Sequence, residues 1–259
     1  MNMIKSLSML IGCATLALAN TVLNYNDPAV QADLAKIAMD DTKETMERLR
    51  AIYGLKNDAL LAELAESENT ALRKAAVYRL SGHTIAKHVY DKDAEVRRSA
   101  VQNRHFNDQL ILADLAKNDV DYIVRALATG KLEDKIVLAD IAKNDENGFV
   151  RYTATKNLND KELLLEFAKN DKDGPARLFA VQWLGLKDKA LLEDFVRQEG
   201  DDWVRLGAAI RLDDQELLAE IARNGQGSDE RERRDIRTRT LGHIKDKAVL
   251  ADIALTIVN

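Results

Sequence analysis

Apolar residues recur along the chain in a repeated helical frame. Each copy opens on one residue and places apolar side chains three, four and seven positions later; most copies add an alanine at the eighth. These steps share one face of a 3.6-residue helix, so each copy predicts a helix with one buried side. Six of the eight openings are aspartates, which favour a helix N-terminus. The openings are Asn57, Gly82, Asp108, Asp134, Asp160, Asp188, Asp214 and Asp246.

A second helix follows in every copy and carries an arginine. A small residue stands three positions after it, and a leucine or isoleucine stands seven positions after it in every copy but one. Arg104 breaks that column. We therefore expect either a distorted third unit or Phe106 in place of the missing aliphatic residue. The arginines recur every 24 to 32 residues, a period typical of stacked repeats, and predict about eight helix pairs with a terminal half repeat. They are Arg48, Arg73, Arg97, Arg125, Arg151, Arg177, Arg205 and Arg237.

An acidic residue precedes the arginine by six positions in five of the eight units. Stacking would bring each arginine near the acid of its own unit or of the next one, and a partly buried guanidinium needs such a carboxylate. Because the pairs recur, we interpret them as a structural ladder and not as a catalytic site, which would occur once. The ladder residues are Asp91, Arg97, Asp119, Arg125, Asp145, Arg151, Asp171, Arg177, Glu199 and Arg205.

The Asp-x5-Arg spacing, the Val-Arg-x2-Ala core and the two-helix unit resemble HEAT-like repeats of the compact bacterial, leucine-rich-repeat-variant type. The resemblance covers residues 27–259. It implies an all-α fold, a right-handed α-α superhelix (HEAT-like solenoid), and for most members a role as a binding scaffold. A few members are enzymes, so an enzyme, a lyase or an accessory subunit stays an alternative.

The first residues predict export. Residues 1–19 have the form of a signal peptide that ends in Ala17-Leu18-Ala19, so residues 20–259 would form the repeat domain of a periplasmic or secreted protein. Two alternatives stay open. Leu10-Ile11-Gly12-Cys13 resembles a lipoprotein box, which would make a lipid-anchored envelope component, or the segment is a buried first helix. Cys13 is the one cysteine, so no disulfide framework is expected.

Composition agrees with a helix-rich chain, and the charge balance argues against nucleic-acid binding. The 259 residues include two prolines and 5% aromatics, and the net charge is −5. A nucleic-acid-binding protein usually carries a basic surplus, which is missing here. We expect a monomer with no membrane partner unless Cys13 is lipidated.

No catalytic or cofactor motif emerges from the residues. His83, His88, His105 and His243 stand in no metal-ligand spacing, and neither a phosphate loop nor a Gly-x-Ser-x-Gly motif is present. We therefore expect no catalysis, no cofactor and no metal. The basic run from Arg231 to Arg239 is interleaved with acids and predicts a solvated helix start.

One stretch of second helices carries apolar residues where helical periodicity predicts outward positions. These positions are polar around Arg97, so the change favours a face that binds a protein or peptide. The alternative is that the side chains fold over the neighbouring helix and complete the core. The residues are Phe149, Tyr152, Leu178, Phe179, Trp203, Leu206 and Ile210. The function that follows is an exported scaffold for protein–protein interaction.

Overall fold

The computed structural model describes residues 24–184, 189–198, 201–225, 227 and 229–258. The predicted leader, Cys13, Asp188 and Glu199 lie outside the described residues. Within them the chain is all α-helical apart from one 3-10 helix, with no strand. It divides into two compact units, Met1–Leu112 and Ala113–Asn259, and the boundary falls within helix α7 (Gln109–Asn118).

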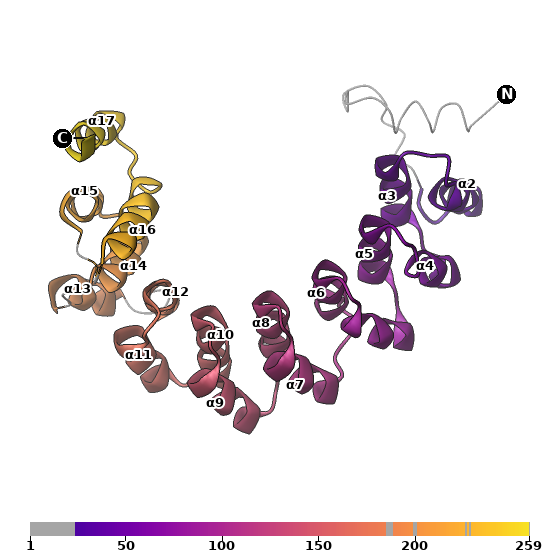
Figure 1. The fold of residues 1–259 in the computed structure, drawn as a ribbon, viewed down its shortest axis with the longest axis horizontal. Coiled ribbons are helices and arrows are strands. Elements are labelled where there is room, and N and C mark those ends of the chain that lie inside the picture. The colour runs from indigo at the N-terminus through magenta and orange to yellow at the C-terminus, as the bar shows by residue number, and fades with distance from the viewer. Residues whose placement is uncertain (1–23, 185–188, 199–200, 226, 228, 259) are drawn as a thin grey trace. The chain divides into compact units, whose positions relative to one another are not determined.

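The described part of the first unit consists of helices packed in consecutive pairs (Figure 1). α3 packs against α5 and α5 against α6, while α2, α4 and η1 each cover their own partner. The helices are α2 (Pro28–Met39), α3 (Thr45–Gly54), α4 (Asp58–Leu64), α5 (Thr70–Arg79), η1 (Gly82–Tyr90) and α6 (Ala94–Gln102).

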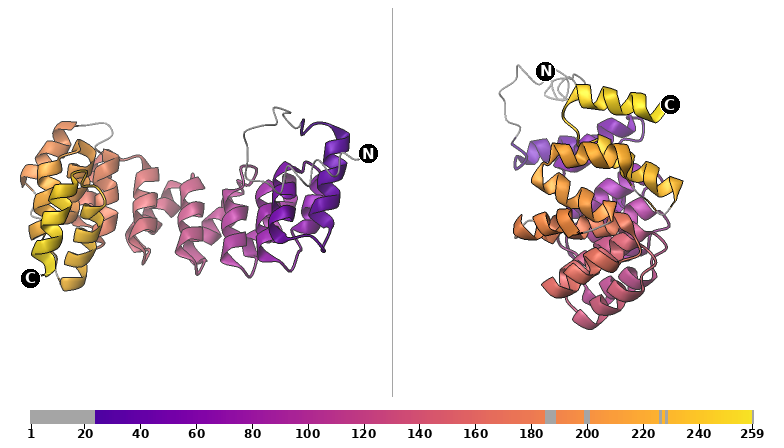
Figure 2. Two further views of the ribbon diagram at one scale, coloured as in Figure 1. Left: turned by 90° about the horizontal axis from the view of Figure 1, so that it is seen from above. Right: turned by 90° about the vertical axis from the view of Figure 1, so that its left-hand side faces the viewer.

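The second unit repeats this packing, with successive helices side by side (Figure 2). α8, α10, α12, α14 and α16 pack in succession, and α9, α11, α13 and α15 each pack on the helix that follows. This arrangement is compatible with a helical repeat solenoid. The helices are α8 (Tyr122–Lys131), α9 (Lys135–Asn144), α10 (Gly148–Leu158), α11 (Lys161–Asn170), α12 (Gly174–Leu184), α13 (Lys189–Gln198), α14 (Asp202–Leu212), α15 (Gln215–Asn224), α16 (Glu230–Leu241) and α17 (Lys247–Val258).

At several openings the predicted residue caps the first helix of its pair. The Asp134 carboxylate accepts from the amides of Ile136 and Val137, and Asp160 and Asp214 cap α11 and α15 in the same way. Each cap satisfies backbone N–H groups that a helix start leaves without a partner. The predicted caps are therefore confirmed at these positions.

In three repeats a side chain six positions after the marking arginine ties the second helix to the one before it. Arg79 donates to the carbonyl of Leu55 at 3.1 Å, and Asn103 donates to that of Leu80 at 2.9 Å. In the second unit Asn157 donates to the carbonyl of Thr129 at 2.9 Å. The accepting carbonyls lie in the last turn or at the C-cap of the preceding helix, where intrahelical partners run out.

The third unit departs from the frame, as Arg104 indicated. Its expected first α-helix is the 3-10 helix η1, because Ser81 supplies no side-chain cap and Gly82 takes a left-handed backbone with φ of 73°. Ile85 and Val89 still reach the core. Phe106 is buried, whereas Arg104 is exposed, so Phe106 takes the place of the missing aliphatic residue.

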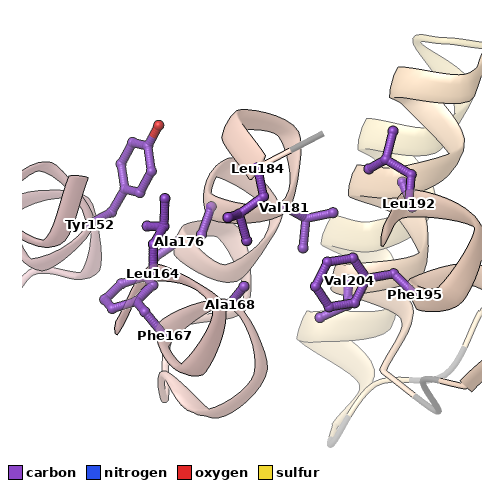
Figure 3. Packing of buried hydrophobic residues seen from close by; sticks show 12 residues of the cluster. Tyr152, Leu164, Phe167, Ala168, Ala176, Val181, Leu184, Leu192, Phe195 and Val204 are labelled. Carbon is purple, nitrogen blue, oxygen red and sulfur yellow. The ribbon is translucent and has the colours of Figure 1, made fainter. Parts of the chain in front are cut away.

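The core of the second unit is formed by the facing sides of each pair. One cluster joins α10 to α14, with Leu164 and Phe167 of α11 below Tyr152 and with Val181, Leu192 and Phe195 packed beyond them (Figure 3). A second cluster continues from α12 to α17. Because each pair shares its core with the next, no pair buries its apolar face alone.

Candidate functional site

Three ladder arginines, Arg97, Arg125 and Arg151, lie buried between successive repeats. Arg151 is 3% exposed and donates through Nε and Nη2 to the Asp171 carboxylate of the following repeat, at 2.9 and 2.6 Å. Its Nη1 donates to the carbonyl of Asp145, six residues earlier, at 2.8 Å. The arginine therefore links a loop of its own repeat to a loop of the next.

The same geometry recurs at two other positions. Arg125 holds Asp145 at 2.9 and 3.1 Å and donates to the carbonyl of Asp119 at 2.9 Å. In the first unit Arg73 holds Asp91 at 3.0 and 3.3 Å. The two-pronged contact matches the planar guanidinium to the two carboxylate oxygens, which makes it directional as well as charged.

Each ladder aspartate also shapes its own turn. In each case the carboxylate accepts a hydrogen bond from the backbone N–H two residues later, at 2.8 Å; this holds for Asp91, Asp119, Asp145 and Asp171. That later residue is itself the N-cap of the second helix at Asp93, Asp121 and Asn147. Sequence reasoning missed these caps, although an Asp or Asn four positions before each arginine was the visible signal.

The pKa values follow this geometry. The hydrogen bond to Asp145 raises the pKa of Arg125 against the effect of burial, and Asp171 does the same for Arg151. Burial alone would raise the pKa of Asp91, but hydrogen bonds from Arg73 and from the Asp93 amide hold it below its usual range. These groups are thus locked in their charged forms and offer no proton for exchange at neutral pH.

The ladder keeps its carbonyl contact at Arg97 but changes toward its C-terminal end. Arg97 donates to the carbonyl of Asp91 at 3.0 Å. Arg177 contacts Asp201, and its Nε has no hydrogen-bond partner among the described residues.

Arg205 departs further and pairs with Asp202 and Glu220, both at 2.8 Å. Its predicted partner Glu199 lies outside the described residues. The last ladder positions therefore use acids that the six-residue spacing did not indicate.

The predicted outward stripe divides into core and surface. Tyr152, Leu178, Trp203 and Leu206 are buried, so for these four the alternative of core completion applies. The physical reason is that neighbouring second helices pack laterally, which covers the residue directly after the marking arginine. The prediction of outward positions assumed that a second helix is covered only by the first helix of its own repeat. It could not include the second helix of the next repeat, which covers another side.

Trp203 is an anchor between repeats and not a surface residue. Its Nε1 donates to Glu232 at 2.8 Å, and the guanidinium of Arg239 lies 5.6 Å from its ring. A Cβ on Gly174 would come within 2.1 Å of the indole, so only glycine leaves room for this ring at the start of α12. Removing the ring would open a cavity.

An aromatic face remains at the surface of α10 and α12. We define it as Phe149, Phe179 and Trp183, which lie beside the buried ring of Tyr152; Phe149 and Trp183 are 42% and 38% exposed. The Phe149 and Phe179 rings meet edge to face at 5.7 Å, and Tyr152 lies 6.0 Å from Phe179. Such contacts stabilise one ring arrangement and present a preformed apolar surface.

Two shallow clefts flank the aromatic face. One of about 380 Å³ is lined by Tyr152, Phe179 and Trp183 together with Ile210 and Arg211 of α14. The other, of about 160 Å³, lies on the far side of Trp183 beside Lys156 and Leu184.

The Lys156 amine stands 4.9 Å from the Trp183 ring and 5.9 Å from that of Tyr152. Sequence reasoning missed Trp183 and Lys156. Trp183 is six positions after Arg177, outside the positions counted as outward, and Lys156 is polar.

No family model and no curated protein matches the chain. The chemistry of its surfaces is therefore the guide to function. Among the described residues, no three His, Cys, Asp or Glu side chains gather in a way that could hold a metal ion. No helix in the described ranges is both long and apolar enough to cross a membrane.

Burial also shifts the pKa of Tyr152, whose ring lies at the aromatic face. It raises the pKa of Tyr152 to about 12. Its phenol stays protonated at neutral pH and can donate a hydrogen bond to a partner. Figure 3 shows the hydroxyl pointing away from the buried side chains of the cluster.

Proposed function

We propose that this protein is a repeat scaffold that binds another protein through the aromatic face of α10 and α12. The exposed rings of Phe149 and Trp183 on a packed base carry the proposal. Aromatic anchors set in shallow clefts supply most of the binding energy in many protein interfaces. A broad surface with clefts of this depth suits a protein segment better than a small molecule.

Charge around the aromatic face supports a partner segment with apolar side chains flanked by acidic ones. Lys156 and Arg211 border the clefts, and neither forms an ion pair with the described residues. An acidic side chain on the partner would be attracted to either cation, which favours encounter and orientation.

The finer architecture and the location belong to the same proposal. The two-layer packing and the repeat period support a right-handed, HEAT-like superhelix of about eight pairs without catalytic activity. The leader pattern in residues 1–19 supports export to the periplasm or the medium.

A display library of random dodecapeptides tests the binding proposal. We expect selection on the full chain to enrich peptides with aromatic or aliphatic residues next to Asp or Glu. The Phe149→Ala/Trp183→Ala double variant should bind them about 30-fold or more weakly, since two anchors are lost. Tyr53→Ala is the matched control, because Tyr53 is a 54% exposed aromatic residue on a second helix of the first unit. Selected peptides that bind the double variant and the parent equally would refute the proposal.

A further inference from the structure

A second surface of the molecule, in the first unit, has the opposite chemistry. A cleft of about 450 Å³ lies at the C-terminal ends of α3, α5 and α6. Its volume falls within the range of small-molecule sites. Three cationic side chains line it: Lys56, Arg79 and Arg104.

None of these cations is neutralised by a carboxylate among the described residues. Lys56 Nζ donates to the Asn26 amide oxygen, Arg79 Nη2 to the Leu55 carbonyl at 3.1 Å, and Arg104 Nε to His105 Nε2 at 3.0 Å. None of the three acceptors is a carboxylate. Since a guanidinium carries five N–H donors, most donors of both arginines stay open to a ligand.

The one carboxylate in the lining is already engaged elsewhere. Asp58 accepts from the Ser81 amide at 3.3 Å and from the Ser81 hydroxyl. It holds the loop after α5 in place and forms no ion pair with the cleft's cations. The cleft therefore keeps a net positive charge.

Several other cations among the described residues do have acidic partners. Lys74 pairs with Glu95 at 3.1 Å, Lys117 with Asp140 at 2.7 Å and Arg223 with Asp252 at 2.8 Å. In a chain of net charge −5, acidic partners are abundant. Three unpaired cations around one concave site therefore form a local positive field that concentrates anions.

The helix ends explain how the cluster forms without a ligand. Lys56, Arg79 and Arg104 all lie at or just beyond a helix C-terminus, where the helix dipole favours positive charge. This effect offsets part of the mutual repulsion between the three cations, but it also lowers the positive potential that an anion meets, so a ligand would have to bind through direct contacts with the three side chains. An oxyanion would complete it with charge-assisted hydrogen bonds.

We propose that this cleft binds a small anionic ligand that carries carboxylate or phosphate groups. Lys56, Arg79 and Arg104 would contact the oxyanion, and the half-exposed ring of Tyr78 forms one wall. The site lies within the first unit and is independent of the aromatic face.

Calorimetric titration of the full chain with citrate and with pyrophosphate, at constant low ionic strength, tests the proposal. We expect saturable one-to-one binding of at least one probe, and the tighter probe identifies carboxylate or phosphate as the preferred group. The Arg79→Gln/Arg104→Gln variant should bind it about 30-fold or more weakly, because two charge-assisted contacts are lost. Arg231→Gln is the matched control, since Arg231 is an exposed arginine of the second unit that lines neither this cleft nor those beside the aromatic face.

Three outcomes would overturn the proposal. Neither probe binds saturably, or the double variant binds as well as the parent, or hexaglutamate binds where neither small anion does. The last result would assign the cleft to an acidic protein segment instead. A thermal melt of the double variant within a few degrees of the parent shows that lost binding is not lost folding.

Discussion

The basic cleft of the first unit and the aromatic face of the second each include a residue from the same repeat position, which we call the outer step: the sixth residue after the marking arginine. Arg79 and Trp183 each stand six residues after a ladder arginine, and both are exposed. Arg79 reaches back to the Leu55 carbonyl, whereas Trp183 lies beneath the Lys156 amine. The repeat thus holds the backbone constant while exposed positions vary, which gives one frame two chemically different surfaces.

Inward positions show the contrary behaviour. Arg73 in the first unit and Arg125 in the second make the same two-pronged contact with an aspartate of the next repeat. Because a buried charge without its partner is costly, these positions do not vary in chemistry. The comparison predicts large effects at inward positions and small ones at the outer step.

The largest effect is expected for Trp203→Ala. This ring is 2% exposed and spans α12, α14 and α16, so its loss should cost about 3–5 kcal/mol of unfolding free energy through the cavity left behind. Trp183→Ala, at the surface, should cost about 1 kcal/mol. Urea melts of both variants measure the difference, and equal losses would erase the distinction between core and face.

Arg151→Ala should cost about 2–4 kcal/mol, because Asp171 would be left buried without its charged partner. Arg211→Ala is the control and should cost about 0.5 kcal/mol or less, as an exposed change. Denaturant midpoints at low and high salt separate the two. A similar small cost for both would mean that the ladder does not hold the repeats together.

The outer step is tested by making the same change in both units. Arg79→Gln and Trp183→Gln should each lower stability by about 1 kcal/mol or less, since glutamine can still donate a hydrogen bond and both sites are exposed. Chemical denaturation monitored by circular dichroism gives both values. A loss above about 2 kcal/mol at either site would show that this step is a packing position there.

The smallest effect concerns pH and Tyr152. Its pKa is about 12 in the folded chain against an ordinary 10.0, so its contribution is complete below pH 10 and declines as the pH rises toward 12. At about pH 10.5 the decline should be under about 1 kcal/mol. The Tyr152→Phe variant should lack this slope between pH 9 and 10.5. The pH titration of phenolate absorbance near 295 nm should show a step at high pH in the parent that is missing in the Tyr152→Phe variant. Titration curves that are the same for both would place Tyr152 in water.

The repeat frame itself was readable from the sequence. The 3.6-residue pattern predicts the helices, Asp134 and Asp160 predict their starts, and Arg104 marks the irregular third unit. These features are local: a cap bonds within three residues, and a helical face repeats within two turns. Local rules therefore need no knowledge of the neighbouring repeat.

Only the tertiary structure decided which side chains the next repeat covers. It showed that the carboxylate bound by Arg151 is that of Asp171 and not that of Asp145. It buried Trp203 against Gly174 and left Trp183 exposed beside Lys156. It also brought Lys56, Arg79 and Arg104 from the C-terminal ends of three helices into one cleft. Each of these outcomes depends on the lateral packing of successive second helices. That packing joins residues some 20 to 30 positions apart, beyond the reach of any local pattern.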